Sequence, residues 1–332
     1  MSRPVQIIIH PSQLPETLRS GLLDGLRSRR LNPKYLYDSP EQTRRWLALH
    51  QAHSPSRNDP ACARSYERAF EAAAGRVSES RVHLVGLGCG GGRKDAGFLG
   101  KLQSAGRELY YTPLDVSVTM VLLARAAAEA VIPETGIHPV VCDLAQAPDL
   151  PSILEKLALP DAARVFTFFG MIPNFQPAVI LPRLASLVRA QDLLLFSANL
   201  APGSDYAAGV RRILPQYDNA LTRDWLLAFL AEMGVDPAAG RLDFDIETDN
   251  AAAGVRRVVA DFRFGSACAL PAGEDAVPFA AGDVLRLFFS YRYTPDRIAD
   301  LLAREGLCVL DRWIAASGEE GVFLVGRARN GS

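Results

Sequence analysis

The sequence predicts an α/β protein built on a doubly wound, mainly parallel β-sheet, together with a second domain of mixed α and β structure. From residue 80 onward, short apolar runs rich in strand-forming residues alternate with stretches of helical periodicity. Residues 201–283 interrupt this rhythm, with helical segments followed by strand-like runs. The predicted strands of the sheet are Val82–Leu87, Leu109–Leu114, Ile137–Cys142, Arg164–Phe169 and Asp192–Ser197.

The same patterns divide the chain into four parts. Residues 1–78 are mostly helical and form part of a cap or substrate domain, and residues 79–200 form the core. Residues 201–283 are an inserted substrate domain, with a loop expected at 266–275. Residues 284–332 return to the end of the core sheet, where two strand-like runs predict a terminal antiparallel pair.

The composition argues against several function classes. The net charge of the 332-residue chain is −1, so no basic field attracts nucleic acid or an anionic membrane. No apolar run approaches the roughly 18 residues of a membrane span, and the run near the N-terminus is too short for a signal peptide. The five cysteines and five histidines lack disulfide or metal-site spacing. We expect a metal-free cytoplasmic protein, either a monomer or a homodimer.

A glycine-rich turn follows the first predicted strand of the core. The apolar run Val82–Leu87 leads directly into Gly88–Gly92. Gly88 and Gly90 allow a sharp turn and a close approach of ligand to backbone, which a side chain would prevent. The helix that begins near Arg93 presents free N–H groups to a polar ligand. Glycines after a strand are also common in turns that bind nothing, so the turn alone leaves both interpretations open.

Two aspartates end the next two predicted strands. Asp115 lies close to the roughly 20-residue offset of a ribose-binding acid, and a carboxylate there accepts hydrogen bonds from both ribose hydroxyls of an adenosine. Asp143 ends the third strand, where an acid accepts a hydrogen bond from an adenine amino group. Each aspartate alone is typical of a helix cap. Together and in this order they favour a ligand that contains adenosine.

The pattern distinguishes two such ligands. A nicotinamide dinucleotide site needs a third glycine at position 93, which is Arg93 here. The sheet also begins only after a long helical stretch, which suits a cap that binds a second substrate. The sequence therefore favours S-adenosylmethionine over NAD.

Short motifs spread along the chain resemble those of the histidine Nα-methyltransferases of ergothioneine biosynthesis and related amino-acid N-methyltransferases. Each motif is weak alone, but their shared order and spacing make chance matches improbable. The resemblance implies a Rossmann-like class I methyltransferase with a mixed α+β cap or substrate domain. The matching segments are Lys34–Asp38, Pro55–Arg57, Leu87–Gly90 with Lys94, Pro113–Ser117, Phe169–Phe175 with Gly170, Tyr217–Asn219 and Ser290–Tyr293.

The resemblance also implies roles for individual residues. Members of the family hold the amino and carboxylate groups of a free amino acid with an Asn and several Tyr side chains, which implies Asn174, Tyr37 and Tyr217 here. It adds Lys94 and Gly170 to the cofactor residues Gly88, Gly90, Asp115 and Asp143. Without the resemblance, Asn174 is typical of a turn, and the two tyrosines are typical of half-buried positions with a hydrogen-bonded hydroxyl.

Four positions depart from the family pattern. The acid expected two residues before the first motif glycine is Gly86, a second tyrosine is replaced by Ser54, and a further acid is replaced by Asn199. The glutamate that reads the imidazole in the histidine enzymes is replaced by Phe288, which accepts no hydrogen bond from an imidazole N–H. A small amino acid or related amine other than histidine therefore suits the predicted pocket, with Ser290, Phe288 and Ser54 shaping it.

Methyl transfer from a sulfonium needs a neutral amine lone pair directed at the methyl carbon and little acid–base chemistry, so proximity and desolvation supply the rate. Two alternatives remain open. The protein could transfer or cyclise the aminocarboxypropyl arm of S-adenosylmethionine and release methylthioadenosine. It could also bind the cofactor without catalysis, which the missing acid at Gly86 weakly favours.

Overall fold

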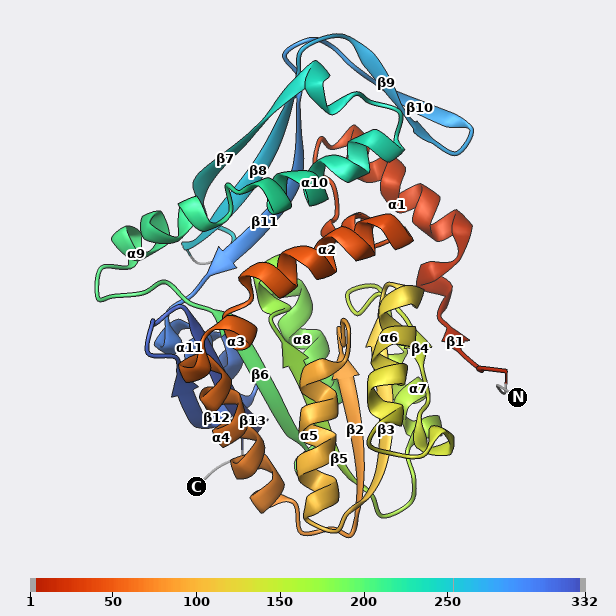
Figure 1. The fold of residues 1–332 in the computed structure, drawn as a ribbon, viewed down its shortest axis with the longest axis vertical. Coiled ribbons are helices and arrows are strands. Elements are labelled where there is room, and N and C mark those ends of the chain that lie inside the picture. Colours follow the sequence, from red (N-terminus) through yellow and green to blue (C-terminus); the bar gives the residue numbers. More distant parts are fainter. Residues whose placement is uncertain (1–3, 253, 329–332) are drawn as a thin grey trace. The chain divides into compact units, whose positions relative to one another are not determined.

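The computed structural model describes residues 4–252 and 254–328 (Figure 1). The chain forms two compact units. The described residues of the first unit are 4–13, 55–200 and 294–328. The second unit contains residues 14–54 and 201–293, apart from residue 253. Each unit therefore combines segments that are far apart in the sequence.

A mainly parallel β-sheet forms the centre of the first unit. From edge to edge its strands run β1-β4-β3-β2-β5-β6-β13-β12. The strands from β1 to β6 pair in parallel, β13 pairs antiparallel with β6, and β12 pairs antiparallel with β13. The strands are β1 (Ile8–Ile9), β2 (Arg81–Leu87), β3 (Glu108–Asp115), β4 (Val140–Val141), β5 (Ala163–Phe169), β6 (Leu193–Asn199), β12 (Leu307–Ile314) and β13 (Glu320–Arg327).

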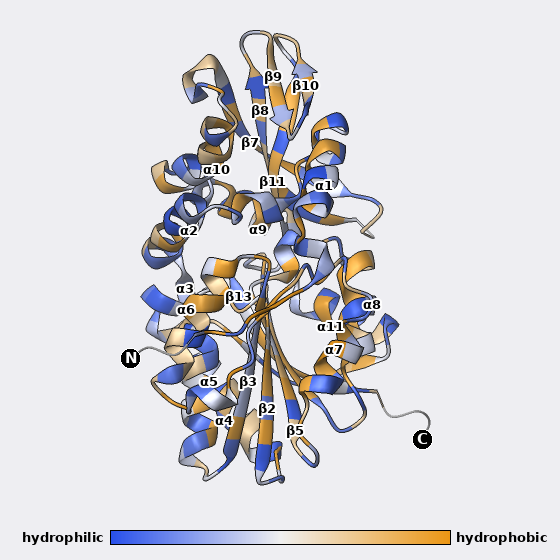
Figure 2. Ribbon diagram, turned by 90° about the vertical axis from the view of Figure 1, so that its right-hand side faces the viewer, coloured by the Kyte–Doolittle hydropathy of each residue, from blue (hydrophilic) through white to orange (hydrophobic). Residues whose placement is uncertain are grey.

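Helices cover both faces of this sheet (Figures 1 and 2). One face carries α4 (Pro60–Arg76), α5 (Arg93–Ser104) and α6 (Val118–Glu129), and the other carries α7 (Leu150–Leu157), α8 (Pro177–Leu187) and α11 (Pro295–Arg304). Figure 2 shows mainly hydrophobic colours along β2 and β5, as expected for strands that helices cover on both sides. The predicted doubly wound, Rossmann-like α/β fold is confirmed.

The strand order reverses at β2. The chain moves from β2 through β3 to β4 on one side, and then returns to place β5 and β6 on the other side. In open α/β sheets, ligands bind beyond the carboxyl ends of the strands at such a reversal. The glycine turn that follows Leu87 lies at this point.

An antiparallel sheet and helices make up the second unit. Its sheet has the order β11-β8-β7, and a separate hairpin joins β9 to β10. Helices α2 and α10 pack against each other. The elements are α1 (Pro15–Arg27), α2 (Pro40–His53), α9 (Tyr206–Ile213), α10 (Ala220–Glu232), β7 (Gly240–Asp249), β8 (Val255–Phe264), β9 (Cys268–Ala272), β10 (Asp275–Phe279) and β11 (Val284–Arg292).

Short helices complete the secondary structure of the described chain. Helix α3 (Pro55–Asn58) precedes α4. The 3₁₀ helices are η1 (Pro11–Gln13), η2 (Pro33–Leu36), η3 (Glu134–Gly136), η4 (Ile172–Asn174), η5 (Leu214–Gln216) and η6 (Pro237–Ala239).

The unit boundaries differ from the expected 1–78, 79–200, 201–283 and 284–332. Helices α3 and α4 belong to the first unit, because the apolar face of α4, including Cys62 and Phe70, packs into the core of that unit. Strand β11 belongs to the second unit, because its backbone pairs with β8. Residues 307–327 form the expected antiparallel pair of the core sheet.

Three local expectations also need correction. The apolar residues Ile8 and Ile9 form β1 at the sheet edge, where the sequence predicted no strand. The expected loop at 266–275 contains β9 and the start of β10, which form a hairpin. The predicted strand Ile137–Cys142 shortens to β4, and Ile137 forms only an isolated bridge with Tyr111. Very short strands carry too little periodic pattern to be recognised from sequence.

The packing of the glycine turn against α6 can be tested at Gly92. Its φ angle is +68°, and a Cβ there would lie 2.5 Å from Cα of Ala124. We expect Gly92→Ala to lower the free energy of unfolding by about 2 kcal/mol or more, because both the positive φ and the clash oppose a side chain. Chemical denaturation measures this change.

Gly100 provides the matched control, because it lies inside α5 and a Cβ there would have no neighbour within 4 Å. We expect Gly100→Ala to raise stability by roughly 0.5–1 kcal/mol. Equal stability of the two variants would contradict the proposed packing.

Candidate functional site

The glycine turn after β2 has left-handed backbone at three positions. The φ angles of Gly88, Gly90 and Gly92 are +69°, +52° and +68°. The N–H groups of Gly88 and Cys89 both donate to the carbonyl of Leu114 at the end of β3, at 2.8 and 2.9 Å. The turn is therefore fixed to the neighbouring strand by backbone hydrogen bonds, and its conformation requires glycine.

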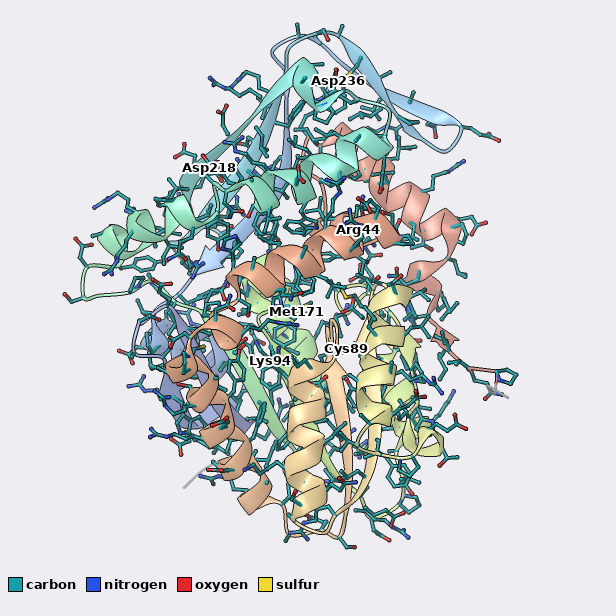
Figure 3. All side chains as sticks on the ribbon, in the orientation of Figure 1. Arg44, Cys89, Lys94, Met171, Asp218 and Asp236 are labelled. Carbon is teal, nitrogen blue, oxygen red and sulfur yellow. The ribbon has the colours of Figure 1, made fainter. Side chains whose placement is uncertain are left out.

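Met171 lies directly against the turn. A Cβ added at Gly88 would come within 2.5 Å of Cε of Met171, so the missing side chain leaves room for this thioether. Figure 3 labels Met171, Cys89 and Lys94 at this end of the central strands. Sequence reasoning did not identify Met171, whose only signal was its position next to Gly170.

Asp115 is positioned by the same turn. Its Oδ2 accepts a hydrogen bond from the N–H of Gly90 at 3.0 Å, and its Oδ1 accepts one from the N–H of Ser117 at 3.1 Å. Burial raises the pKa of the Asp115 carboxyl, while the N–H groups of Ser117 and Gly90 act in the opposite direction. The expected pair of glycine turn and acid is thus present, and the acid is held in one orientation.

Asp143 is held by the N-terminal segment of the chain. Its N–H donates to Oγ of Ser12 at 3.0 Å, and Oγ of Ser12 lies 2.8 Å from Nδ1 of His10. Nε2 of His10 lies 2.9 Å from Oδ1 of Asp149. The Asp143 carboxylate also accepts from the N–H of Ala145, as in a cap. Sequence reasoning found Asp143 but missed the residues that position it.

Lys94 and Gly170 are linked by a buried polar network. Nζ of Lys94 donates to the hydroxyl of Tyr66 at 2.8 Å, and this hydroxyl donates to the carboxylate of Glu320. The same hydroxyl lies 2.9 Å from Oγ of Ser197, which accepts the N–H of Gly170 at 2.9 Å. Burial lowers the pKa of Lys94, and the Glu320 carboxylate partly compensates. Tyr66 and Glu320 lie outside the motifs, so sequence reasoning missed them.

A second hydrogen-bonded group lies in the second unit. The hydroxyl of Tyr217 donates to Oγ of Ser290 at 2.7 Å and accepts from Nη2 and Nε of Arg292 at 2.9 and 3.2 Å. Arg292 is only 7% exposed. Phe288, Ser290 and Arg292 alternate along β11, as residues on one face of a strand do. That period of two was available in the sequence and would have identified Arg292.

Aromatic rings join the remaining predicted residues of this unit. The ring of Trp225 lies 5.5 Å from the rings of both Tyr37 and Phe288, measured between centroids. The ring of Tyr217 lies 6.3 Å from Phe288, and that of Trp46 lies 5.7 Å from Tyr37. Tyr37, Tyr217 and Phe288 therefore belong to one cluster with two tryptophans that the sequence analysis did not select.

Asn174 and Ser54 occupy different settings. Asn174 ends η4 in the first unit, where its N–H donates to the carbonyl of Met171 at 3.0 Å. Ser54 ends α2 in the second unit, is 8% exposed and donates its N–H to the carbonyl of His50 at 3.0 Å. Asn174 and Ser54 therefore belong to different units.

A family model matches residues 17–327 of the chain and describes a histidine-specific, S-adenosylmethionine-dependent methyltransferase. The chain belongs to this methyltransferase family. The match spans both units and confirms the suspected family. The protein is therefore an S-adenosylmethionine-dependent methyltransferase. No curated protein sequence matches the chain.

Solved structures that resemble the methyltransferase are distant. The mitomycin 7-O-methyltransferase has 15% identity and a TM-score of 0.43, covering 87% of this chain and 69% of its own. The magnesium protoporphyrin IX methyltransferase from Synechocystis PCC 6803 has 12% identity and a TM-score of 0.46, covering 87% and 95%. The 1,6-didemethyltoxoflavin-N1-methyltransferase from Burkholderia thailandensis has 13% identity and a TM-score of 0.42, covering 88% and 91%.

The cofactor of the methyltransferase fits the first unit chemically. Gly88 and Gly90 in the glycine turn are partly exposed, and the Asp115 carboxylate is a fixed acceptor at the strand end. Among the residues that the structure describes, no group of His, Cys, Asp and Glu side chains is arranged to hold a metal ion. Within the same residues, no helix is long and apolar enough to span a membrane.

We propose that Asp115 binds the ribose of S-adenosylmethionine, and Asp115→Asn tests this role. A hydrogen bond to a charged acceptor contributes roughly 1.5–3 kcal/mol, so we expect cofactor affinity to fall about 10- to 100-fold. Isothermal titration calorimetry measures the affinity directly. Asp300→Asn, at an exposed position of α11, is the control and should bind as the parent does. Unchanged affinity in the Asp115 variant would show that this carboxylate does not hold the ribose.

Proposed function

We propose that this methyltransferase transfers the methyl group to the amino group of a small amino acid or related amine other than histidine. The observation that carries the proposal is the Tyr217–Ser290–Arg292 group beside Phe288 in the second unit. Three of these four residues stand where the resemblance implies contacts to an amino-acid acceptor. The fourth, Arg292, lies on the same face of β11.

The charged and hydrogen-bonding groups of this cluster suit the amino and carboxylate groups that all free amino acids share. Arg292 is a buried side chain whose Nε and Nη2 groups donate to the hydroxyl of Tyr217, and the geometry of a guanidinium suits the binding of a carboxylate. The hydroxyls of Tyr217 and Ser290 add groups that can both donate and accept hydrogen bonds. A carboxylate supplied by the acceptor is the ligand that this chemistry favours.

The aromatic part of the cluster argues against histidine as the methyl acceptor. Phe288 is 6% exposed and packs edge-on against Trp225, so a polar ring next to it would lose its hydrogen bonds. The family name describes histidine-specific enzymes, yet the glutamate that would read the imidazole is absent from this position. An apolar or aromatic side chain on the acceptor avoids that cost.

The proposed mechanism requires binding and orientation more than acid–base catalysis. S-adenosylmethionine supplies the methyl group as an electrophilic sulfonium. We propose that Tyr37, Asn174 and Tyr217 orient the neutral amine, while Ser290, Phe288 and Ser54 shape the site for its side chain. Proximity of the reactants and exclusion of water then supply the rate.

The reaction class is tested by incubating the protein with S-adenosylmethionine and pooled amino acids, followed by mass spectrometry of the products. We expect S-adenosylhomocysteine together with one amino acid that has gained a methyl group. Methylthioadenosine would instead indicate transfer or cyclisation of the aminocarboxypropyl arm. Cofactor binding without any product across the panel would indicate a non-catalytic protein, and either result would contradict the proposal.

Tyr217→Phe tests the acceptor residues once an acceptor is known. Removing the hydroxyl takes away a hydrogen-bond partner of Ser290 and of Arg292, and a hydrogen bond to a charged group contributes roughly 1.5–3 kcal/mol. We expect kcat/KM for the acceptor to fall about 10- to 100-fold, with cofactor affinity unchanged. Steady-state kinetics and calorimetry separate the two quantities.

Tyr110→Phe is the matched control, because among the described residues its hydroxyl bonds only to the exposed Glu108 carboxylate on the same strand. We expect parental kinetics for this variant. Equal losses in both variants, or none in either, would remove Tyr217 from the acceptor site.

A further inference from the structure

Gly86, two residues before the glycine turn, lacks the acidic side chain that the family pattern leads one to expect. The structure shows what fills this position. A Cβ at Gly86 would overlap Oδ2 of Asp95 and would lie 3.0 Å from the hydroxyl of Tyr111. A carboxylate is therefore present where a side chain on residue 86 would be, and it comes from the first turn of α5.

Two neighbouring strands fix the Asp95 carboxylate. Its Oδ2 accepts the hydroxyl of Tyr111 on β3 at 2.6 Å, and its Oδ1 accepts Oγ1 of Thr167 on β5 at 2.8 Å. Asp95 is only 2% exposed. A carboxylate accepts about four hydrogen bonds, so two bonds leave it able to interact with a further donor or cation. The side chain is held rigidly at the strand reversal that the glycine turn follows.

The neighbouring Lys94 interacts with the charge of this carboxylate but forms no ion pair with it. Lys94 directs its Nζ to the hydroxyl of Tyr66 and lies 3.8 Å from the Glu320 carboxylate. Within residues 4–252 and 254–328, no Lys, Arg or His side chain forms an ion pair with Asp95. Burial raises the pKa of Asp95 to about 6, against the hydrogen bonds from Tyr111 and Thr167 and the charge of Lys94.

The Asp95 carboxylate interacts electrostatically with a residue of the glycine turn. Burial raises the pKa of the Cys89 thiol well above its ordinary value, and the carboxylates of Asp115 and Asp95 add to this rise. Burial also raises the pKa of Tyr111 well above its ordinary value. The titratable groups that interact with Asp95 are Lys94, Tyr111 and Cys89. Burial also raises the pKa of the Asp115 carboxyl at the same turn, so only a comparison with an Asp95 variant assigns a pH dependence to Asp95.

We propose that Asp95 supplies the negative charge that stabilises the cationic end of bound S-adenosylmethionine, from the place that a side chain on residue 86 would otherwise occupy. The cofactor carries a sulfonium and an ammonium group, and an opposite charge in a buried setting favours the ionised carboxylate. Gly86 is then required for this arrangement, because any side chain there would displace Asp95. This inference concerns cofactor binding alone and does not depend on the acceptor.

Asp95→Asn tests the charge while keeping the size of the side chain. A cation that lowers the pKa of Asp95 by one unit binds about tenfold more tightly to the ionised protein. We expect the Asn variant to bind S-adenosylmethionine at least about tenfold more weakly than the parent at pH 7.5. In the parent, affinity should fall as the pH drops from about 7 to 5, and in the variant this fall should be smaller. Calorimetry without acceptor measures both.

Thr167→Val is the matched control, because it removes one hydrogen bond to Asp95 and keeps the charge. We expect a loss of no more than about threefold and a retained pH dependence. If Asp95 only supports the packing, Asp95→Asn and Thr167→Val will weaken binding equally, and that result would overturn the proposal. A pH dependence in Asp95→Asn as steep as that of the parent would overturn it as well.

A relocated carboxylate gives a second test. Gly86→Asp combined with Asp95→Ser places the acid on β2 and removes the side chain that it would strike. We expect this double variant to bind the cofactor at least about fivefold more tightly than Asp95→Ser alone, with thermal unfolding as the check on folding. Affinity no higher than that of Asp95→Ser would argue against a role for charge at this position.

Discussion

The left-handed backbone of Gly88, Gly90 and Gly92 is the constraint on which the first unit depends. These positive φ angles turn the chain from β2 into α5 within five residues. The turn brings the N–H of Gly90 to Asp115, and the start of α5 brings Asp95 beneath the turn and Lys94 to Tyr66. One tight turn thus determines the placement of three charged side chains, because each lies within a few residues of it or bonds to it directly.

The second unit buries a cation and two hydroxyl groups among aromatic rings. Arg292 meets Tyr217, and Tyr217 meets Ser290, so each polar group has a partner inside an otherwise apolar cluster. Burial without such partners would cost several kcal/mol. The rings of Trp225 and Phe288 close the cluster on one side. Such an arrangement is costly for packing alone, and this cost supports the proposed role of the cluster in acceptor binding.

Much of the core could be predicted because its signals are local. The strand runs, the glycine turn and the two aspartates at strand ends each depend on residues that are close in sequence, and parallel strands align their carboxyl ends. The unit boundaries could not be predicted in the same way. Helix α4 and strand β11 resemble their neighbours in sequence, and only burial of their apolar faces and backbone pairing decide which unit they join.

The sequence by itself determined the fold class, the family and the departures at Gly86 and Phe288, since these depend on residue identity and spacing. Only the tertiary structure showed that the missing side chain at Gly86 makes room for Asp95, nine positions further along the chain. It also showed Tyr66 and Glu320 holding Lys94, and Arg292 holding Tyr217. The physical reason is that a hydrogen bond or a steric overlap depends on distance in space, which spacing along the chain does not specify.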